Sequence, residues 1–136
     1  MYLVDMNVWL ERLLDQEKSE EVGRFLAQIP SNLLFVTDFT FRSIGIILSR
    51  LKRTDVLLQF VRDAFIEGNV LIVHFGPEEI AAVVETMRKF GLDFDDAYQY
   101  VAAERHDLLI VSFDRDFDRT QRRRKTPADL IWVLFN

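Results

Sequence analysis

The 136-residue sequence contains no cysteine, which excludes disulfide bridges, thiolate metal ligands and cysteine nucleophiles. It also lacks any apolar run that approaches the roughly 18 residues of a membrane-spanning helix. The segment from Met1 to Asp5 has no basic region ahead of an apolar stretch, so a secretory signal is not expected. A cytoplasmic protein without a membrane segment is the simplest interpretation.

An excess of positive charge is absent as well. The chain has 17 Lys and Arg residues against 22 Asp and Glu residues, which gives a formal net charge of −5. This balance argues against a protein that is held on nucleic acid by its overall field. It does not exclude a nuclease, because a metal-dependent nuclease needs clustered acids to hold its cations and only a local basic patch to contact phosphates.

Short apolar runs alternate with longer amphipathic segments along the whole chain, and 49% of the residues are hydrophobic. The length and composition fit one domain over residues 1–136. The pattern predicts an α/β fold, a three-layer α/β/α sandwich around a mostly parallel sheet of about five strands. We expect strands at 3–4, 33–36, 70–73, 108–111 and 130–134, and helices at 8–14, 20–29, 39–51, 55–68, 77–91 and 95–106.

Helix ends are marked by polar residues and by glycine. Asp38 and Asp55 are expected to cap the helices that follow them, and Asp93 or Asp95 is expected to start the last long helix. Gly91 is expected to end the helix before it.

Four aspartates follow or approach predicted strand ends. Asp5 follows the first strand directly, Asp114 follows the fourth by three residues, and Asp116 lies two residues further on. Asp96 lies in the first turn of the helix that precedes the fourth strand. In parallel sheets, ligands bind beyond the carboxyl ends of the strands, so these segments deliver acids towards one edge.

A cluster of carboxylates is costly unless a cation neutralises it. Mg²⁺ and Mn²⁺ prefer oxygen ligands, and such an ion activates water and stabilises charge on a phosphodiester. Each acid taken singly is also an ordinary strand end or helix cap. Their joint placement is what favours a metal site.

Other polar and aromatic residues are open to two interpretations. A basic run after Asp114 is either an RNA-phosphate contact or a solvated loop, and it consists of Arg119, Arg122, Arg123, Arg124 and Lys125. His74 and His106 are expected to lie outside the chemistry, since the acids already supply a metal-hydrolysis scheme. Apolar helices near 9–14 and 39–51 form either ordinary core or a groove for a partner helix.

Three short segments resemble motifs of the PIN-domain family, in particular the toxin ribonucleases of VapBC toxin–antitoxin pairs. Residues 4–10, VDMNVWL, are similar to the opening strand of the family with its Asp-x-Asn. Residues 95–98, DDAY, are similar to the start of the helix that carries another family acid. Residues 111–117, VSFDRDF, look like the Thr-x-Asp-x-Asp-Phe of the family, with serine for threonine. The ordered set spans nearly the whole chain.

The resemblance implies cleavage of RNA that depends on Mg²⁺ or Mn²⁺, inhibition by an antitoxin protein, and a homodimer. It implies that Asp5, Asp96 and Asp114 are catalytic metal ligands, directly or through water, and that Asp116 supports a second ion. Asn7 would orient the site and Ser112 would brace the Asp114 loop by hydrogen bonding.

One position departs from the family pattern. The resemblance places a glutamate of the family at Ser43, within the segment Thr40 to Ile44. Serine can accept a hydrogen bond from a metal-bound water but brings no charge, and Asp38 lies near enough in sequence to compensate in part. The alternative function is therefore a PIN-like module with weakened catalysis that acts in RNA binding or protein assembly.

Overall fold

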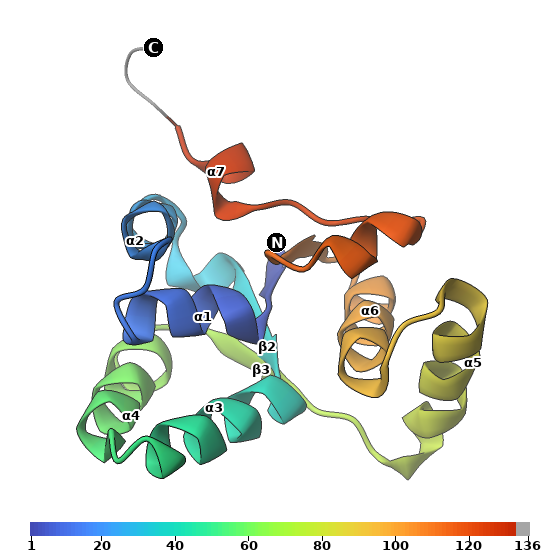
Figure 1. Ribbon diagram of the computed structural model, residues 1–136, viewed down its shortest axis with the longest axis horizontal. Coiled ribbons are helices and arrows are strands. Elements are labelled where there is room, and N and C mark those ends of the chain that lie inside the picture. The colour runs from blue at the N-terminus through green and yellow to red at the C-terminus, as the bar shows by residue number, and fades with distance from the viewer. Residues whose placement is uncertain (133–136) are drawn as a thin grey trace.

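Four short parallel strands form the centre of the computed structural model, which describes residues 1–132 (Figure 1). Their order across the sheet is β3-β2-β1-β4. The strands are β1 (Tyr2–Val4), β2 (Leu34–Thr37), β3 (Leu71–Val73) and β4 (Leu109–Val111). Tyr2 lies beside both Leu34 and Leu109, so β1 is a central strand and all four carboxyl ends meet at one edge. The predicted α/β/α arrangement is confirmed.

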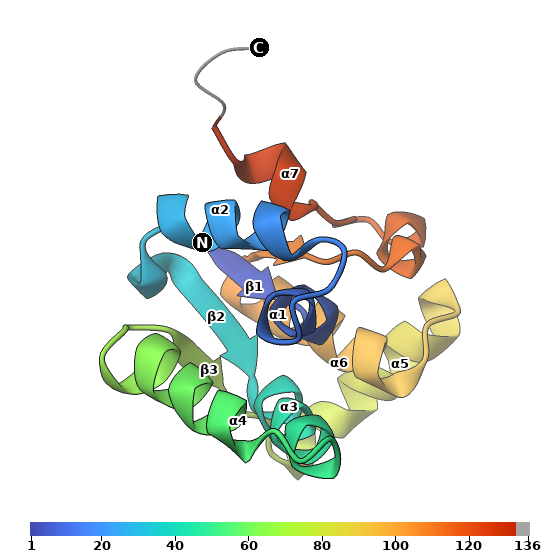
Figure 2. The same cartoon turned by 60° about the vertical axis from the view of Figure 1, so that its left-hand side comes forward.

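Helices cover both faces of this sheet, as the two views show (Figures 1 and 2). One face carries α1 (Met6–Leu13), α2 (Ser19–Gln28), α3 (Asp38–Arg50) and α4 (Thr54–Val61), which a π-helical turn over Arg62–Ile66 extends. The other face carries α5 (Ile80–Phe90) and α6 (Phe94–His106). Shorter elements are the 3-10 turns Ser31–Leu33, Pro77–Glu79 and Arg115–Arg119, and α7 (Pro127–Leu130). Within residues 1–132, no helix combines the length and apolar character needed to cross a membrane.

Two hydrophobic cores lie on opposite faces because successive side chains of a strand point in opposite directions. Leu3 and Ile110 pack into the core under α5 and α6. Their neighbours Val4 and Val111 pack into the core under α1 to α4, with Phe25. Both faces are thus buried, which explains why the strands read as continuous apolar runs.

The expected helix boundaries hold at two positions and fail at two. Gly91 ends α5 with a left-handed φ of 65°, and Asp93 caps α6 by accepting a hydrogen bond from the Asp96 N–H at 3.2 Å. The cap of α3, however, is Thr37, whose hydroxyl accepts from the Thr40 N–H at 3.0 Å, and the first position of that helix is Asp38. The residue before α4 is Arg53, so Asp55 lies inside the helix.

The fifth strand expected at 130–134 is not formed in its described part, since Leu130 ends α7 and Ile131 is irregular; residues 133 and 134 lie outside the described residues. A shorter segment pairs with β4 instead. The Ser112 N–H donates to the Lys125 carbonyl at 2.9 Å, and the Lys125 N–H donates to the Ile110 carbonyl at 2.8 Å. Pairing stops there because a capping box at Thr126 starts α7.

Candidate active site

The candidate site lies at the carboxyl edge of the sheet, where each acid has a defined local position. Asp5 follows β1 and caps α1 by accepting a hydrogen bond from the Met6 N–H at 2.8 Å. Asp114 follows β4 and caps the turn Arg115–Arg119 by accepting from the Asp116 N–H at 2.9 Å. Asp96 lies in the first turn of α6. Backbone N–H groups therefore hold the loops that present these carboxylates.

Carboxylate oxygens converge at this edge. Asp96, Asp114 and Asp116 each offer an oxygen within 4.8 Å of the others. Asp93, Asp95 and Asp96 form a second such group, so the two groups share Asp96. An all-oxygen set of this kind suits a hard divalent cation.

Asp5 is held by a network of donors. It is buried, and its Oδ2 accepts a hydrogen bond from the Ser112 hydroxyl at 2.7 Å while its Oδ1 accepts from the Gln99 amide at 3.0 Å. The Ser112 Oγ in turn accepts from the Asp114 N–H at 2.9 Å and from the Asn7 amide at 3.3 Å. Asn7 and Ser112 thus tie the end of β1 to the loop after β4, which is the arrangement that a bracing role requires.

Burial and mutual repulsion change the protonation of the site. Burial is the main cause that raises the pKa of Asp96 to about 9, and a hydrogen bond with Asp114 and the charges of Asp114, Asp93 and Asp5 add to it. The pKa of Asp5 is also raised by burial, against the opposing hydrogen bonds from Ser112, Gln99 and Met6. In the absence of a cation, Asp96 is therefore protonated near neutral pH, and its proton lies among the negative charges of Asp114, Asp93 and Asp5. The residues fit a divalent cation, which would neutralise the same charge.

Ser43 and Asp38 belong to a neighbouring depression. Ser43 lines it together with Asp38, Phe39, Arg42 and Tyr98. Asp38 accepts a hydrogen bond from the Tyr98 hydroxyl at 2.7 Å and lies 3.6 Å from Arg42. The contacts of Asp38 are made outside the group Asp96, Asp114 and Asp116, so its expected compensating role at that group has no support in the hydrogen bonding.

The basic run divides between two places. Arg122 donates to Asp107 at 3.0 Å and to the Leu108 carbonyl at 3.1 Å, at the amino end of β4 and away from the acids. Arg124 instead donates to the Ser112 carbonyl at 3.2 Å and to Asp118. Arg123 has a left-handed φ of 58° and Lys125 is exposed while its backbone pairs with β4. These four residues do not form one patch.

Two residues contact the acids: Arg119, which the sequence interpretation placed in the basic run, and Gln99, which it left out. Arg119 donates to Asp116 at 3.1 Å, and Gln99 donates to Asp5. Gln99 stands three residues after Asp96 in a buried stretch of α6. A polar residue one helical turn from an acid, inside an otherwise apolar or aromatic run, is the signal that could have identified it.

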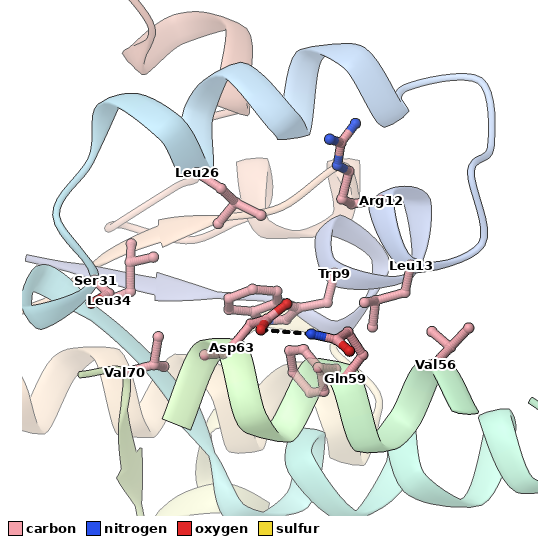
Figure 3. Close-up of a pocket in the computed structure, with 12 residues that line it drawn as sticks. Trp9, Arg12, Leu13, Leu26, Ser31, Leu34, Val56, Gln59, Asp63 and Val70 are labelled. Atoms are coloured by element: carbon pink, nitrogen blue, oxygen red, sulfur yellow. Dashed lines mark hydrogen bonds between the residues drawn. The ribbon is translucent and has the colours of Figure 1, made fainter. Parts of the chain in front are cut away.

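A separate apolar pocket of about 460 Å³ lies between α1, α2 and α4 (Figure 3). Leu13, Leu26 and Val56 point into the same space from these three helices. Trp9 also lines the pocket, and its buried indole N–H has no hydrogen-bond partner among the described residues. The sequence interpretation placed a possible groove between 9–14 and 39–51. The pocket is lined by α1 but not by α3, so it does not correspond to that groove.

Comparisons with known proteins agree with this fold. The family model described as PIN domain matches residues 2–123. The chain is similar to a toxin–antitoxin complex from Klebsiella pneumoniae at 16% identity, with a TM-score of 0.74 and coverage of 93% of this chain and 98% of that one. It is similar to FitAcB from Neisseria gonorrhoeae at 21% identity, with a TM-score of 0.73 and coverage of 96% and 100%.

A third similar structure is VapC20 of Mycobacterium tuberculosis, described as a toxin that cleaves the sarcin-ricin loop. The identity is 15%, the TM-score is 0.74, and the match covers 87% of this chain and 93% of that one. No curated protein sequence matches this chain. At these identities the solved structures show the fold.

The raised pKa of Asp96 predicts how stability depends on pH in metal-free buffer. Between the ordinary value of 3.8 and the folded value of about 9, the folded protein binds this proton and the unfolded chain does not. The free energy of unfolding should therefore fall as the pH rises through this window. Asp96→Asn should flatten this dependence because asparagine does not titrate. Urea unfolding in EDTA at about pH 6 and pH 8 measures it.

The matched control is Asp107→Asn, which removes an acid that is 94% exposed at the other end of the sheet. It should keep the wild-type pH dependence. A wild-type dependence in Asp96→Asn would instead contradict the assignment of the buried proton.

Proposed function

The chain belongs to the PIN domain family, and from this premise we propose that it is a divalent-metal-dependent endoribonuclease, the toxin of a toxin–antitoxin pair in the cytoplasm. The observation that carries the proposal is the convergence of Asp96, Asp114 and Asp116 at the edge where the donor network fixes Asp5. Two structures with the same fold are named as a toxin–antitoxin complex and as a sarcin-ricin loop cleaving toxin, which supports this choice of class.

The proposed ligands of Mg²⁺ or Mn²⁺ are Asp5, Asp96 and Asp114, with Asp116 supporting a second ion. When bound, the metal supplies Lewis-acid stabilisation of the phosphate and lowers the pKa of a coordinated water. Asp96 would hold the cation as a carboxylate, because a bound cation favours the deprotonated form. The backbone N–H groups of Met6 and Asp116 keep the carboxylates oriented.

The remaining polar residues would hold the Asp114 loop and contact the RNA. Asn7 accepts a hydrogen bond from the Phe113 N–H at 3.2 Å and so fixes the loop that carries Asp114. Arg124 lines a surface hollow together with Asn7 and Arg115, which places cations where an RNA phosphate can approach. We assign RNA contact to Arg124 and Lys125, whereas Arg122 pairs with Asp107 at the opposite edge. Arg123 is exposed.

The second candidate is a PIN-like module with weakened catalysis, acting in RNA binding or protein assembly. Ser43 favours it, because this position brings no negative charge to the site. The two candidates differ in one measurable property: a ribonuclease couples RNA cleavage to a bound cation, and a binding module retains RNA without cleaving it.

Removal of one carboxylate tests the ribonuclease directly. Asp5→Asn or Asp96→Asn should abolish Mn²⁺-dependent cleavage of a labelled RNA, a loss of at least about 100-fold, because each removes a charged metal ligand. Circular dichroism should show an intact fold in both. Asp107→Asn is the control and should cleave like the wild type. If both site variants cleave at the wild-type rate with the same metal dependence, the site is wrongly assigned.

The pocket between α1, α2 and α4 is the proposed contact for the antitoxin. An apolar side chain of the partner would fill the space between Leu13, Leu26 and Val56. The apolar lining of this space is the feature that favours a hydrophobic segment of the antitoxin as its occupant.

A charge inside this pocket should weaken antitoxin binding and leave cleavage unchanged. Leu13→Glu places a carboxylate in the apolar space, and we expect at least about a tenfold loss of affinity for the co-expressed product of the adjacent gene. Ile66→Glu is the matched control, because Ile66 is 74% exposed and does not line the pocket. Surface plasmon resonance measures the affinity of each variant for the antitoxin. Equal affinities of the pocket variant and the control would show that the antitoxin binds elsewhere.

We also propose a homodimer. Exposed aliphatic side chains on α3 and near α4 favour it, namely Ile46, Leu51 and Leu58, each at least half exposed. Light scattering at tens of micromolar protein should give twice the chain mass of 16.0 kDa. A mass of one chain at that concentration would rule out the dimer.

A further inference from the structure

Gln99 lies at the junction of three elements that build the site. It belongs to α6, three residues after Asp96, and its exposed fraction is 4%. Its side chain reaches Asp5 at the end of β1 and Thr40 in the first turn of α3. Gln99 therefore connects α3 to Asp5.

The hydrogen bonds of Gln99 fix the orientation of its amide. Nε2 donates to Asp5 Oδ1 at 3.0 Å and to Thr40 Oγ1 at 2.6 Å. A carboxylate only accepts hydrogen bonds, so the amide nitrogen must face Asp5. Both N–H groups are then used, and Oε1 is left buried with no partner among the described residues.

A buried amide oxygen without a donor is costly, and most buried polar atoms in proteins are paired. Nε2 and Oε1 are bonded to the same carbon, so this oxygen lies in the immediate neighbourhood of the Asp5 carboxylate. An apolar side chain of the same size would fill the volume without this cost. A water molecule beside Oε1 would supply the missing donor.

We propose that Gln99 is a positioning residue of the metal site, a step that rests on the proposed ribonuclease function. Its N–H groups hold Asp5 in one orientation, and its Oε1 accepts a hydrogen bond from water in the hydration shell of the cation. Mg²⁺ and Mn²⁺ sites commonly retain bound water, and this water is a strong donor. A neutral amide supplies the contact without adding charge to Asp5, Asp93, Asp96 and Asp114, where repulsion is already high.

The test compares Mn²⁺ affinity with stability in the full-length protein. Gln99→Met keeps the volume and removes both polar functions, and calorimetric titration should show Mn²⁺ binding about 10- to 100-fold weaker than in the wild type. Thermal unfolding in EDTA should change little, because loss of the bond to Asp5 is offset by removal of the unpaired oxygen. Tyr100→Phe is the control for a change in the same buried helix, and it should bind Mn²⁺ like the wild type.

Thr40→Val supplies a second, independent variant, because Thr40 is the other anchor of the amide. Mn²⁺ affinity should fall several-fold, and the double variant should bind no more weakly than Gln99→Met alone, since both changes act through one contact. This variant also carries the test if Gln99→Met does not fold.

Three outcomes would overturn the inference in distinguishable ways. Wild-type Mn²⁺ affinity in Gln99→Met and in Thr40→Val overturns the role of Gln99 and leaves the ribonuclease proposal intact. Absence of Mn²⁺ and Mg²⁺ binding by the wild type overturns both. A fall in unfolding temperature at unchanged affinity would show that the amide has a structural role only, which also overturns the inference.

Discussion

The burial of carboxylates, together with their mutual repulsion, is the constraint on which this structure depends. The parallel sheet ends its strands at one edge, and the loops there bring carboxylate oxygens of Asp96, Asp114 and Asp116 within 4.8 Å of one another. Without a cation the protein meets this cost by two means. Asp96 keeps a proton, and Asp5 is surrounded by donors from Ser112, Gln99 and the Met6 backbone. A divalent ion bound as proposed would supply the positive charge that this edge lacks.

The scaffold makes such a cluster possible because both faces of the sheet are buried. Leu3 and Val4 anchor β1 in two different cores, so the residue that follows, Asp5, has little freedom to move away from its neighbours. The Ser112 hydroxyl then connects Asp5 to the Asp114 loop. The alternating apolar side chains of β1 fix the end of the strand, and the fixed strand end determines the position of the Asp5 carboxylate.

Much of the architecture could be predicted from local pattern. The strand that ends at Val4 and the helix stop at Gly91 follow from apolar runs and from backbone preference, and the structure contains both. The Gln99 contacts could not be predicted, because they depend on α3 and α6 meeting beside β1, which no sequence spacing specifies. The division of the basic run also depends on a tertiary contact. The backbone of Lys125 pairs with β4, so Arg122 and Arg124 contact different ends of that strand.

The central claim is that this edge of the sheet holds a hard divalent cation. Anomalous diffraction from crystals grown with Mn²⁺ tests it most directly, since manganese can be located independently of the protein atoms. The account predicts a peak between the carboxylates of Asp5, Asp96 and Asp114, with oxygen ligands at about 2.0–2.2 Å. Ordered carboxylates with no anomalous peak between them at saturating Mn²⁺, or a peak only at another acidic group, would contradict it.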